Sequence, residues 1–299
     1  MKKALLRRIM SEELRDLKLS DHPAVNDLCM GIWGGRDYVP DSFPKWIEND
    51  LNYPIGIFSG DVLQAIGNLE VKSGKESGWV KGLRVRESQR RKGLASRLVD
   101  EMILRAKKEG LDYLRYATSS RNIASMKVAE NLGFELKNGV CYFRLEPPFP
   151  PHPAPSPNII PLYVGHDRLH DILATSDLIP GDTFAVRWEF HNKDVISLES
   201  ILESETAHLV FGDNGKAESL TFFSSFDRNG QRTTAFSIFS TNRSIFVDVL
   251  SRALDYLEST KTERAAFFLG PRVEEWVEFT IPVPKEFAGR RFLLYEMKV

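Results

Sequence analysis

The sequence is poor in cysteine and has no long apolar run. Cys29 and Cys141 are the only cysteines among 299 residues, which excludes a zinc cluster and a disulfide framework. No stretch approaches the roughly 18 consecutive apolar residues of a membrane-spanning helix. The basic segment 1–16 has too short an apolar part for a signal peptide. We therefore expect a globular, cytoplasmic protein in which both thiols are reduced, small buried side chains.

An excess of charge of one sign is also lacking, because 40 basic and 41 acidic residues give a formal net charge of −1. The balance changes along the chain, with 25 basic and 20 acidic residues up to Glu146 and 15 and 21 beyond it. Within Lys81–Arg97 there are seven basic residues and one acidic residue. This local positive field suits a phosphate-bearing ligand, although a solvated basic face is the alternative. A nucleic-acid partner is not expected, because the first half is only weakly basic.

Half of the prolines lie in one short segment. Residues 147–161 carry eight of the sixteen. Proline fixes φ and lacks a backbone donor, so this segment can be neither a helix nor a central strand. We expect a semi-rigid linker between two domains, and a proline-rich ligand for a partner protein is the alternative. The sequence thus predicts a domain over 1–146, a linker over 147–161 and a second domain over 162–299.

The same order of elements is predicted in both halves: three strands, a long helix, a strand, a short helix and a last strand. The long helix of the first half is 94–108, with the apolar stripe Leu94, Leu98, Met102 and Ala106 and a stop at Gly110. Its counterpart is 244–259. The expected strands are 55–59, 62–71, 79–85, 111–117 and 140–145, and then 208–212, 219–227, 233–239, 265–269 and 291–297. The pattern predicts an α/β (α+β) fold present twice.

A basic turn precedes the long helix of the first half. Its residues are Arg90, Arg91, Lys92, Gly93, Leu94, Ala95 and Ser96. The first turn of a helix leaves N–H groups unpaired at the positive end of the dipole, and a glycine lets a ligand approach the backbone closely. We predict an anion cradle for a pyrophosphate, with an ordinary polar helix start as the alternative. The segment is neither a Walker A nor a GxGxxG motif, since it has one glycine and no GK[ST].

Two motifs resemble one family. The turn from Arg90 through Gly93 to Ala95, after a strand ending Leu83-Arg84-Val85, resembles the acetyl-CoA loop of the GNAT N-acetyltransferases. In NIASMKVAENLGF, the residues Asn122, Ala124, Ser125, Gly133 and Phe134 resemble the GNAT helix and turn after the fifth strand. The resemblance covers about residues 20–146 and implies the GNAT acyl-CoA N-acyltransferase fold, a mixed, mostly antiparallel sheet with flanking helices. It also implies acetyl-CoA as cofactor, contacted by Leu83, Arg84, Val85, residues 90–96, Asn122 and Ser125.

A narrower resemblance concerns the acceptor. Residues 32–46 and 81–85 resemble the histidine N-acetyltransferase-type GNATs, which also carry a second C-terminal domain. This implies an acyltransferase in which the primary amine of a small amino-acid-like acceptor attacks acetyl-CoA directly in a ternary complex. An α-amine is the less demanding acceptor, because its pKa lies nearer neutrality than that of lysine. We expect a small-molecule acceptor, no nucleic acid or membrane partner, and a monomer or homodimer. The alternatives are a non-catalytic acyl-CoA-binding or regulatory module and a protein N-terminal acetyltransferase.

The resemblance also implies that the strand at Lys81–Val85 diverges from the strand at 111–117, with the N–H of Leu83 or Val85 facing the developing oxyanion. Simple alternation would place Trp79, Lys81, Leu83 and Val85 on one face. Lys81 would then hold an acceptor carboxylate or lie exposed. Glu70, on the neighbouring strand, is the candidate base, with a solvated carboxylate as the alternative.

Each of the other candidate residues has two alternative roles. Many GNATs have a tyrosine at the position of Ala129, so Tyr116 and Tyr142 are the candidate proton donors, or else packed aromatics. Three residues on the turn where the family lines its acceptor pocket are candidates for binding the acceptor, with helix capping and core packing as the alternative: Trp33, Asp37 and Tyr38. No metal site is expected, because no Glu completes an HExxH motif with His166 and His170. The second long helix starts without a glycine, at 240–245, so the second domain is expected to lack an acetyl-CoA loop.

Overall fold

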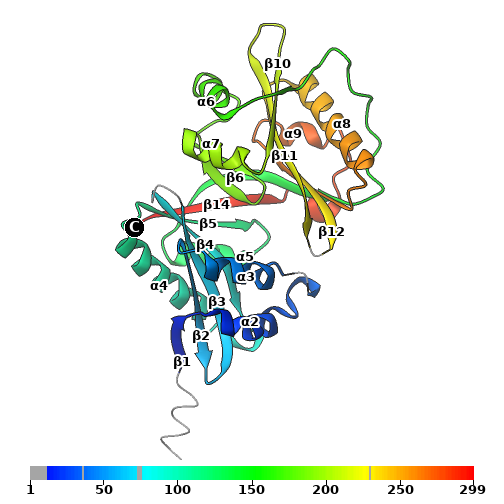
Figure 1. Cartoon of the computed structure of the whole chain (residues 1–299). Helices are drawn as coiled ribbons and strands as arrows, with labels where there is room; N and C mark the ends of the chain where they lie inside the picture. Colours follow the sequence, from blue (N-terminus) through cyan, green and yellow to red (C-terminus); the bar gives the residue numbers. More distant parts are fainter. Residues whose placement is uncertain (1–11, 36, 73–75, 229) are drawn as a thin grey trace, which may run out of the picture. The chain divides into compact units, whose positions relative to one another are not determined.

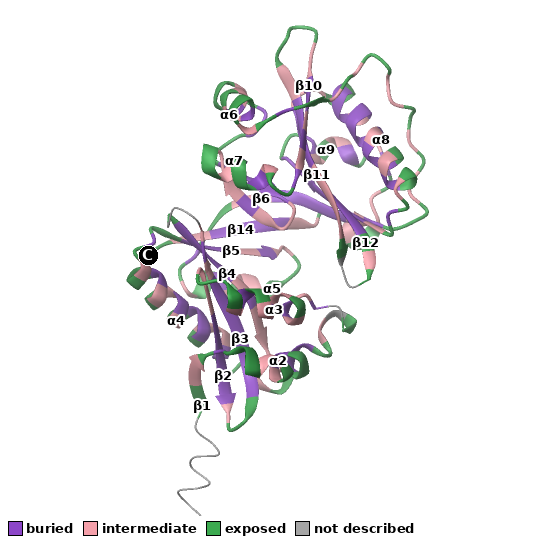
Figure 2. Cartoon of the chain, viewed as in Figure 1, coloured by how far each residue is buried: buried purple, intermediate pink, exposed green. Residues whose placement is uncertain are grey.

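The computed structural model describes residues 12–35, 37–72, 76–228 and 230–299, without the side chains of Trp33 and Arg228. The chain divides into two compact units. Unit 1 holds the described residues up to Tyr116 together with Ile123–Lys137 and Tyr295–Val299, and unit 2 holds Ala117–Asn122 and Asn138–Leu294 (Figure 1). In each unit the buried residues concentrate on the strands and on one side of the helices (Figure 2). No helix in the described ranges is long and apolar enough to cross a bilayer.

Unit 1 is built on an antiparallel sheet that is extended by one parallel strand. The antiparallel neighbours are, in spatial order, β1 (Glu12–Asp16), β2 (Asn52–Ser59), β3 (Val62–Val71) and β4 (Ser77–Val85). The next strand, β5 (Tyr113–Ser119), runs parallel to β4. Parallel neighbours need a crossover connection, and α4 (Leu94–Glu109) supplies it. The four strands expected up to residue 117 are therefore confirmed as β2 to β5, while β1 was not expected.

Helices cover both faces of the unit 1 sheet. On one face, α2 (His22–Cys29) and α3 (Val39–Glu48) share a buried cluster with Ile66 of β3. On the other face, Met102 of α4 lies close to Gly67, the next residue of β3. Successive residues of a strand point to opposite faces, so the helices lie on opposite sides. The predicted stripe of α4 is buried, and α5 (Ile123–Asn131) follows β5.

Unit 2 repeats this arrangement. Its antiparallel neighbours are, in spatial order, β7 (Leu162–Tyr163), β10 (Thr206–Phe211), β11 (Ala217–Arg228) and β12 (Gln231–Ser240). The long helix α8 (Arg243–Ser259) leads to β13 (Arg264–Leu269), which is parallel to β12. The helix buries the expected residues Ile245, Val249, Ala253 and Leu257. A parallel strand reached through a long helix therefore follows an antiparallel set in both units.

The remaining elements lie between or after these. They are η1 (Leu19–Asp21), η2 (Ile32–Gly34), η3 (Glu87–Gln89), η4 (Lys285–Phe287), α6 (His166–Thr175), β8 (Thr183–Val186), β9 (Glu189–Asn192), α7 (Val195–Leu202), α9 (Glu274–Val277), β6 (Glu135–Leu145) and β14 (Arg291–Lys298). The sequence pattern indicated neither β8, β9 nor α7. A second buried cluster joins α6 and α7 to β10 and β11.

The last strand of each half is divided between the two units. Cys141–Leu145 of β6 pair with β13 in unit 2. At the other end of the chain, Glu296 of β14 forms an ion pair with Arg115 at 2.9 Å in unit 1, and the Tyr295 hydroxyl donates to Glu130. A hydrophobic pattern predicts that a strand exists but not which strand it pairs with. The compact units therefore differ from the predicted halves at both last strands, and the linker at 147–161 stays a prediction.

Candidate active site

The basic turn before α4 is sharply bent and exposed. Arg90, Arg91, Lys92 and Gly93 are all exposed. Gly93 has φ of 80° and Arg91 has φ of 65°, in the left-handed region that favours glycine. Gly93 is the residue directly before the first turn of α4 (Leu94–Glu109). The start of the longest helix of unit 1 therefore faces solvent.

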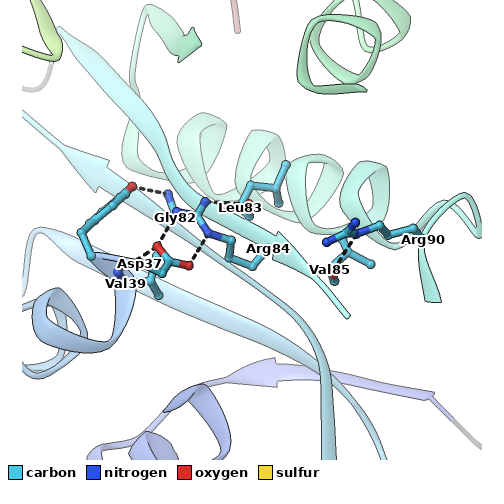
Figure 3. A network of polar contacts seen from close by, with 8 residues as sticks. Asp37, Val39, Gly82, Leu83, Arg84, Val85 and Arg90 are labelled. Atoms are coloured by element: carbon cyan, nitrogen blue, oxygen red, sulfur yellow. Dashed lines mark hydrogen bonds and ion pairs between the residues drawn. The ribbon is translucent and has the colours of Figure 1, made fainter. Parts of the chain in front are cut away.

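The N–H groups at this helix start remain accessible. None of the described side chains caps α4 at Gly93, and a Cβ placed on Gly93 would meet nothing within 4 Å. The neighbouring cations point elsewhere: Arg90 Nε donates to the carbonyl of Val85 at 3.4 Å (Figure 3), and Lys92 Nζ donates to Gln89 Oε1 at 2.8 Å. Uncapped N–H groups, the positive end of a helix dipole and three nearby cations fit the pyrophosphate of acetyl-CoA.

The strands beside this turn diverge. The parallel pairing of β4 with β5 runs from Ser77 opposite Tyr113 to Val80 opposite Tyr116, and no further pair is recorded among the described residues. β4 nevertheless continues to Val85, opposite Ala65 of β3. Beyond Val80, one edge of β4 therefore has backbone groups that do not pair with β5, as the resemblance implied. Such an edge can bind an extended polar chain through main-chain hydrogen bonds.

A bulge interrupts β4 at this point. Lys81 lies opposite Asn68 and Arg84 lies opposite Ile66, so two residues of β4 face the single residue Gly67. Gly82 has φ of 62°, and a Cβ there would collide with the ring of Trp46. The prediction that alternation continues through β4 is wrong. Lys81 and Arg84 share the face toward α3, and Leu83 and Val85 turn to the face covered by α4.

A buried ion pair lies on the α3 face. Arg84 donates from Nε to Asp37 Oδ2 and from Nη2 to Asp37 Oδ1, both at 2.7 Å (Figure 3). The Asp37 side chain is 1% exposed, and its Oδ1 also accepts from the Val39 N–H. Burial is the largest single influence and lowers the pKa of Arg84, but the hydrogen bonds to Asp37 and the nearby charges together outweigh it, so the pKa is raised. The structure thus joins a residue expected to contact the cofactor to one expected to contact the acceptor.

Tyr38 connects this pair to the bulge. Its hydroxyl accepts from the Gly82 N–H at 3.2 Å, and the Arg84 guanidinium lies 5.3 Å from the centre of its ring. A guanidinium over an aromatic face is an attractive arrangement. Tyr38 therefore holds the bulge and the ion pair in one position. The side chain of Trp33, the third residue expected on this turn, lies outside the described part of the chain.

The candidate base forms ion pairs with two lysines. Glu70 bonds to Lys72 at 2.9 Å and to Lys81. The structure therefore brings together the expected base and the expected acceptor-binding lysine, and a base role requires that Glu70 exchange a lysine for the acceptor amine. Next to them, Asn68 is fully buried, and its Oδ1 has no hydrogen-bond partner in the described residues. Sequence reasoning missed Asn68, although a polar residue within the apolar run 62–71 was a usable signal.

Tyr116 is the candidate proton donor that lies in unit 1. It is 7% exposed, and its hydroxyl is hydrogen-bonded to the Ser125 hydroxyl. Burial raises the pKa of Tyr116, and Ser125 acts in the opposite direction. The charges of Arg84 and Tyr38 also influence this pKa, so the phenol faces the same polar cluster. At neutral pH the phenol is protonated and able to donate.

Tyr142 and Asn122 lie in unit 2. The ring of Tyr142 is 3% exposed and packs against Phe268, with centroids 5.0 Å apart. Its hydroxyl accepts from Arg144. Tyr142 thus has the packing that the alternative interpretation described, while its role as a proton donor stays a prediction.

Neither thiol is reactive in this structure. Burial raises the pKa of Cys29 to about 12, with a further contribution from Asp37, and burial raises the pKa of Cys141 to about 12 as well. Thiols remain protonated at neutral pH under these conditions, so neither is an activated nucleophile. Among the described side chains, no three His, Cys, Asp or Glu gather in a way that would hold a metal ion.

Comparisons with known proteins agree with this geometry. Residues 12–134 match the acetyltransferase (GNAT) family. An L-methionine sulfoximine/L-methionine sulfone acetyltransferase of Pseudomonas aeruginosa is 30% identical over 141 residues, which are 42% of this chain and 82% of that protein. This chain belongs to the GNAT acetyltransferase family. It is therefore an acyltransferase of a family that generally uses acetyl-CoA, as the resemblance implied.

Solved structures extend the similarity to the GNAT fold of both units. A GCN5-related N-acetyltransferase from Sphaerobacter thermophilus is similar over 96% of this chain and 95% of its own, with a TM-score of 0.66 and 13% identity. A tandem GNAT protein from the clavulanic acid biosynthesis pathway covers 96% of this chain and 98% of its own, with a TM-score of 0.59 and 11% identity. The predicted fold, a GNAT fold in tandem, is confirmed.

Proposed function

We propose that this GNAT transfers the acetyl group of acetyl-CoA to the α-amine of a small, amino-acid-like acceptor. The observation that carries the proposal is an open, uncapped helix start at Gly93 beside a strand edge that leaves its parallel neighbour after Val80. The similarity to a Pseudomonas aeruginosa acetyltransferase of methionine derivatives supports an acceptor of this class.

The cofactor is assigned to the α4 side of the bulge. Residues 90–96 would hold the pyrophosphate through the N–H groups of the first turn of α4. The edge of β4 at Leu83 and Val85 would hold the pantetheine arm through its backbone, and Ser125 would add one of the contacts that the resemblance implied. Acetyl-CoA supplies the acetyl group as a thioester, which the neutral amine attacks, so that a C–N bond forms and the C–S bond breaks.

The chain's own residues then position the acceptor and move protons. An N–H group of Leu83 or Val85 would stabilise negative charge on the thioester oxygen. Tyr116, buried and protonated, would give a proton to the departing thiolate. Glu70 would accept the proton of the amine after exchanging Lys81 for the acceptor. An α-amine makes this last step easier, since it loses its proton nearer to neutral pH than a lysine amine does.

The α3 face of β4 suits an amino acid. It carries the cations of Lys81 and Arg84 and the carboxylates of Glu70 and Asp37 within one cluster. Alternating charges of this kind complement a zwitterion that presents a carboxylate and an amine close together. We assign Lys81 to the acceptor carboxylate. Tyr38 would line the pocket, and the Asp37–Arg84 pair would hold its floor in place.

A thiol-release assay with acetyl-CoA tests this proposal. The acceptors are L-methionine sulfone, L-methionine sulfoximine and L-histidine, compared with a peptide with a free N-terminus and with spermidine. We expect turnover with at least one free amino acid and little with spermidine. Binding of acetyl-CoA without turnover on any acceptor would instead indicate a non-catalytic acyl-CoA-binding module. A preference for the peptide would indicate a protein N-terminal acetyltransferase.

A Lys81→Met variant then tests the acceptor pocket. Loss of the ammonium should raise the KM for the amino acid about tenfold or more, because a charge-assisted hydrogen bond to the carboxylate is lost. The KM for acetyl-CoA should change little, since Lys81 lies on the opposite face from Leu83 and Val85. Equal changes in both constants would contradict the assignment.

A further inference from the structure

Unit 2 contains a cavity that has no role in the proposed reaction. It lies between α8 and the face of β10, β11 and β12 that α8 covers, and its volume is about 350 Å³. The residues that line it come from the proline-rich segment, from these strands and from α8: Pro155, Pro161, His208, Val210, Thr221, Phe223, Phe236, Val249, Arg252, Ala253, Asp255 and Tyr256. The size and the largely apolar lining are typical of a small-molecule site.

Aromatic rings form most of the inner wall. Phe223 stacks on Phe236 with centroids 5.7 Å apart, and Tyr256 meets Phe223 edge-on at 5.5 Å and Phe236 edge-on at 6.2 Å. Ring faces and edges at these spacings favour a further flat ring over a branched aliphatic group.

Two polar side chains on this wall form no hydrogen bond with another described residue. His208 on β10 and Thr221 on β11 are directly opposite in the sheet, so both side chains are on the same face. Neither side chain has a hydrogen-bond partner in the parts of the chain that the structure describes, although His208 is half-buried and Thr221 is 7% exposed. Burial lowers the pKa of His208, so its imidazole is neutral near pH 7 and has one donor and one acceptor nitrogen. Both groups can therefore bond to a ligand in the cavity, and one ligand hydroxyl has the donor and the acceptor that this pair requires.

The charged groups of the lining are already paired. Arg252 donates to Asp248 at 2.7 Å and to the carbonyls of Ser156 and Ile159 at 2.6 and 2.7 Å. Asp255 bonds to His152 at 2.9 Å. These contacts also fasten the proline-rich segment against α8, along which it runs (Figure 1). The wall formed by Pro155 and Pro161 is thus held in place, and the cavity favours a neutral ligand.

The matching interface of unit 1 is closely packed at Gly67 of β3. There, α4 approaches β3 so closely that a Cβ on Gly67 would collide with Met102 and reach Leu83 at 3.3 Å. Protein interiors are normally filled to this density, and an open apolar space forfeits packing contacts. The open space beside α8 lacks such packing contacts, and a bound ligand would supply them.

We propose that this cavity binds a small, neutral aromatic compound with a hydroxyl group. The ring would pack against Phe223, Phe236 and Tyr256, and the hydroxyl would donate to His208 and accept from Thr221. The proposal does not depend on the acceptor assigned to unit 1, because every residue that it uses lies in unit 2.

Calorimetry with p-cresol and toluene on the full chain tests the proposal. The two probes share a ring and a methyl group and differ in the hydroxyl. We expect saturable binding of p-cresol at millimolar concentration or below, and weaker binding of toluene. In His208→Leu the affinity for p-cresol should fall about tenfold, the effect of one lost hydrogen bond, while that for toluene stays unchanged. Equal affinity of the wild type for both probes would overturn the assignment of the hydroxyl.

Ala253→Phe tests where the ring of the ligand binds, because the larger side chain would fill the cavity from α8. Binding of both probes should disappear while acetyl-CoA binding in unit 1 is retained. If this variant does not fold, Thr221→Val replaces it, and its affinity for p-cresol should fall a few-fold. Absence of p-cresol binding to the wild type, or unchanged binding to these variants, would show that the cavity is not the site.

Discussion

The two units start their long helices in different ways. In unit 1, α4 follows Gly93, which has φ of 80°, and none of the described side chains caps it. In unit 2, α8 follows Asn242, whose Oδ1 accepts from the N–H groups of Ser244 at 2.9 Å and Ile245 at 3.3 Å. N–H groups bonded to their own cap are not available to an anion. The same position in the fold is therefore open to a ligand in one unit and closed by a side chain in the other.

Each unit also buries a carboxylate beside an arginine, but the number of carboxylate oxygens that are hydrogen-bonded differs. Both oxygens of Asp37 are bonded to Arg84. Glu205 of unit 2 bonds through Oε1 to Arg187 at 2.7 Å and to Ser224 at 2.9 Å, while its buried Oε2 has no partner in the described residues. Burial raises the pKa of Glu205 in spite of Arg187. A buried carboxylate is well compensated when the arginine engages both oxygens.

Asp37→Asn should have the largest effect on stability. The substitution keeps the shape of the side chain but leaves the guanidinium of Arg84 buried without a counter-charge. Removing one partner of a buried pair costs about 3–5 kcal/mol. Urea unfolding, followed by a signal from unit 1, measures the loss. A loss below about 1 kcal/mol would mean that the pair behaves like a surface salt bridge.

Gly93→Val should have the largest effect on cofactor binding. Valine is strained at φ of 80°, so the turn would rearrange, and its branched side chain would enter the space in front of the helix start. We expect the affinity for acetyl-CoA, measured by calorimetry, to fall by about 100-fold or more, the range expected when backbone contacts to a pyrophosphate are lost.

Two variants separate this effect from simple destabilisation. Gly110 at the other end of α4 has φ of 73°, so Gly110→Val introduces similar strain far from the turn and should leave acetyl-CoA affinity unchanged. Asn242→Ala removes the cap of α8 and should lower stability by about 1 kcal/mol, again without a change in affinity. Weakened binding in either variant would count against the open helix start as the reason for the difference between units.

The features that could be predicted from the sequence are those that depend on the spacing of nearby residues. The stripe of α4 and the single glycine before it follow the helical period, so both could be predicted. The bulge at Gly82 was harder, because a glycine within a strand signals a possible bulge but not its register. Because of the bulge, the side chain on the α3 face is that of Arg84 and not that of Leu83. The Asp37–Arg84 pair joins residues 47 positions apart, and no periodic pattern relates them.

The carboxylate of unit 2 gives a test that depends on pH. Because the pKa of Glu205 is raised in the folded state, the native protein binds more protons than the unfolded chain between the two pKa values, and stability decreases as the pH rises through that range. Glutamine does not titrate, so the stability of Glu205→Gln relative to wild type should increase from pH 4 to pH 7. Urea unfolding at both pH values measures this difference. For Asp37→Asn we expect a loss of stability at pH 7, where Arg84 would lack its partner. A Glu205→Gln variant that becomes relatively less stable toward pH 7 would show that Arg187 compensates its carboxylate as fully as Arg84 compensates Asp37.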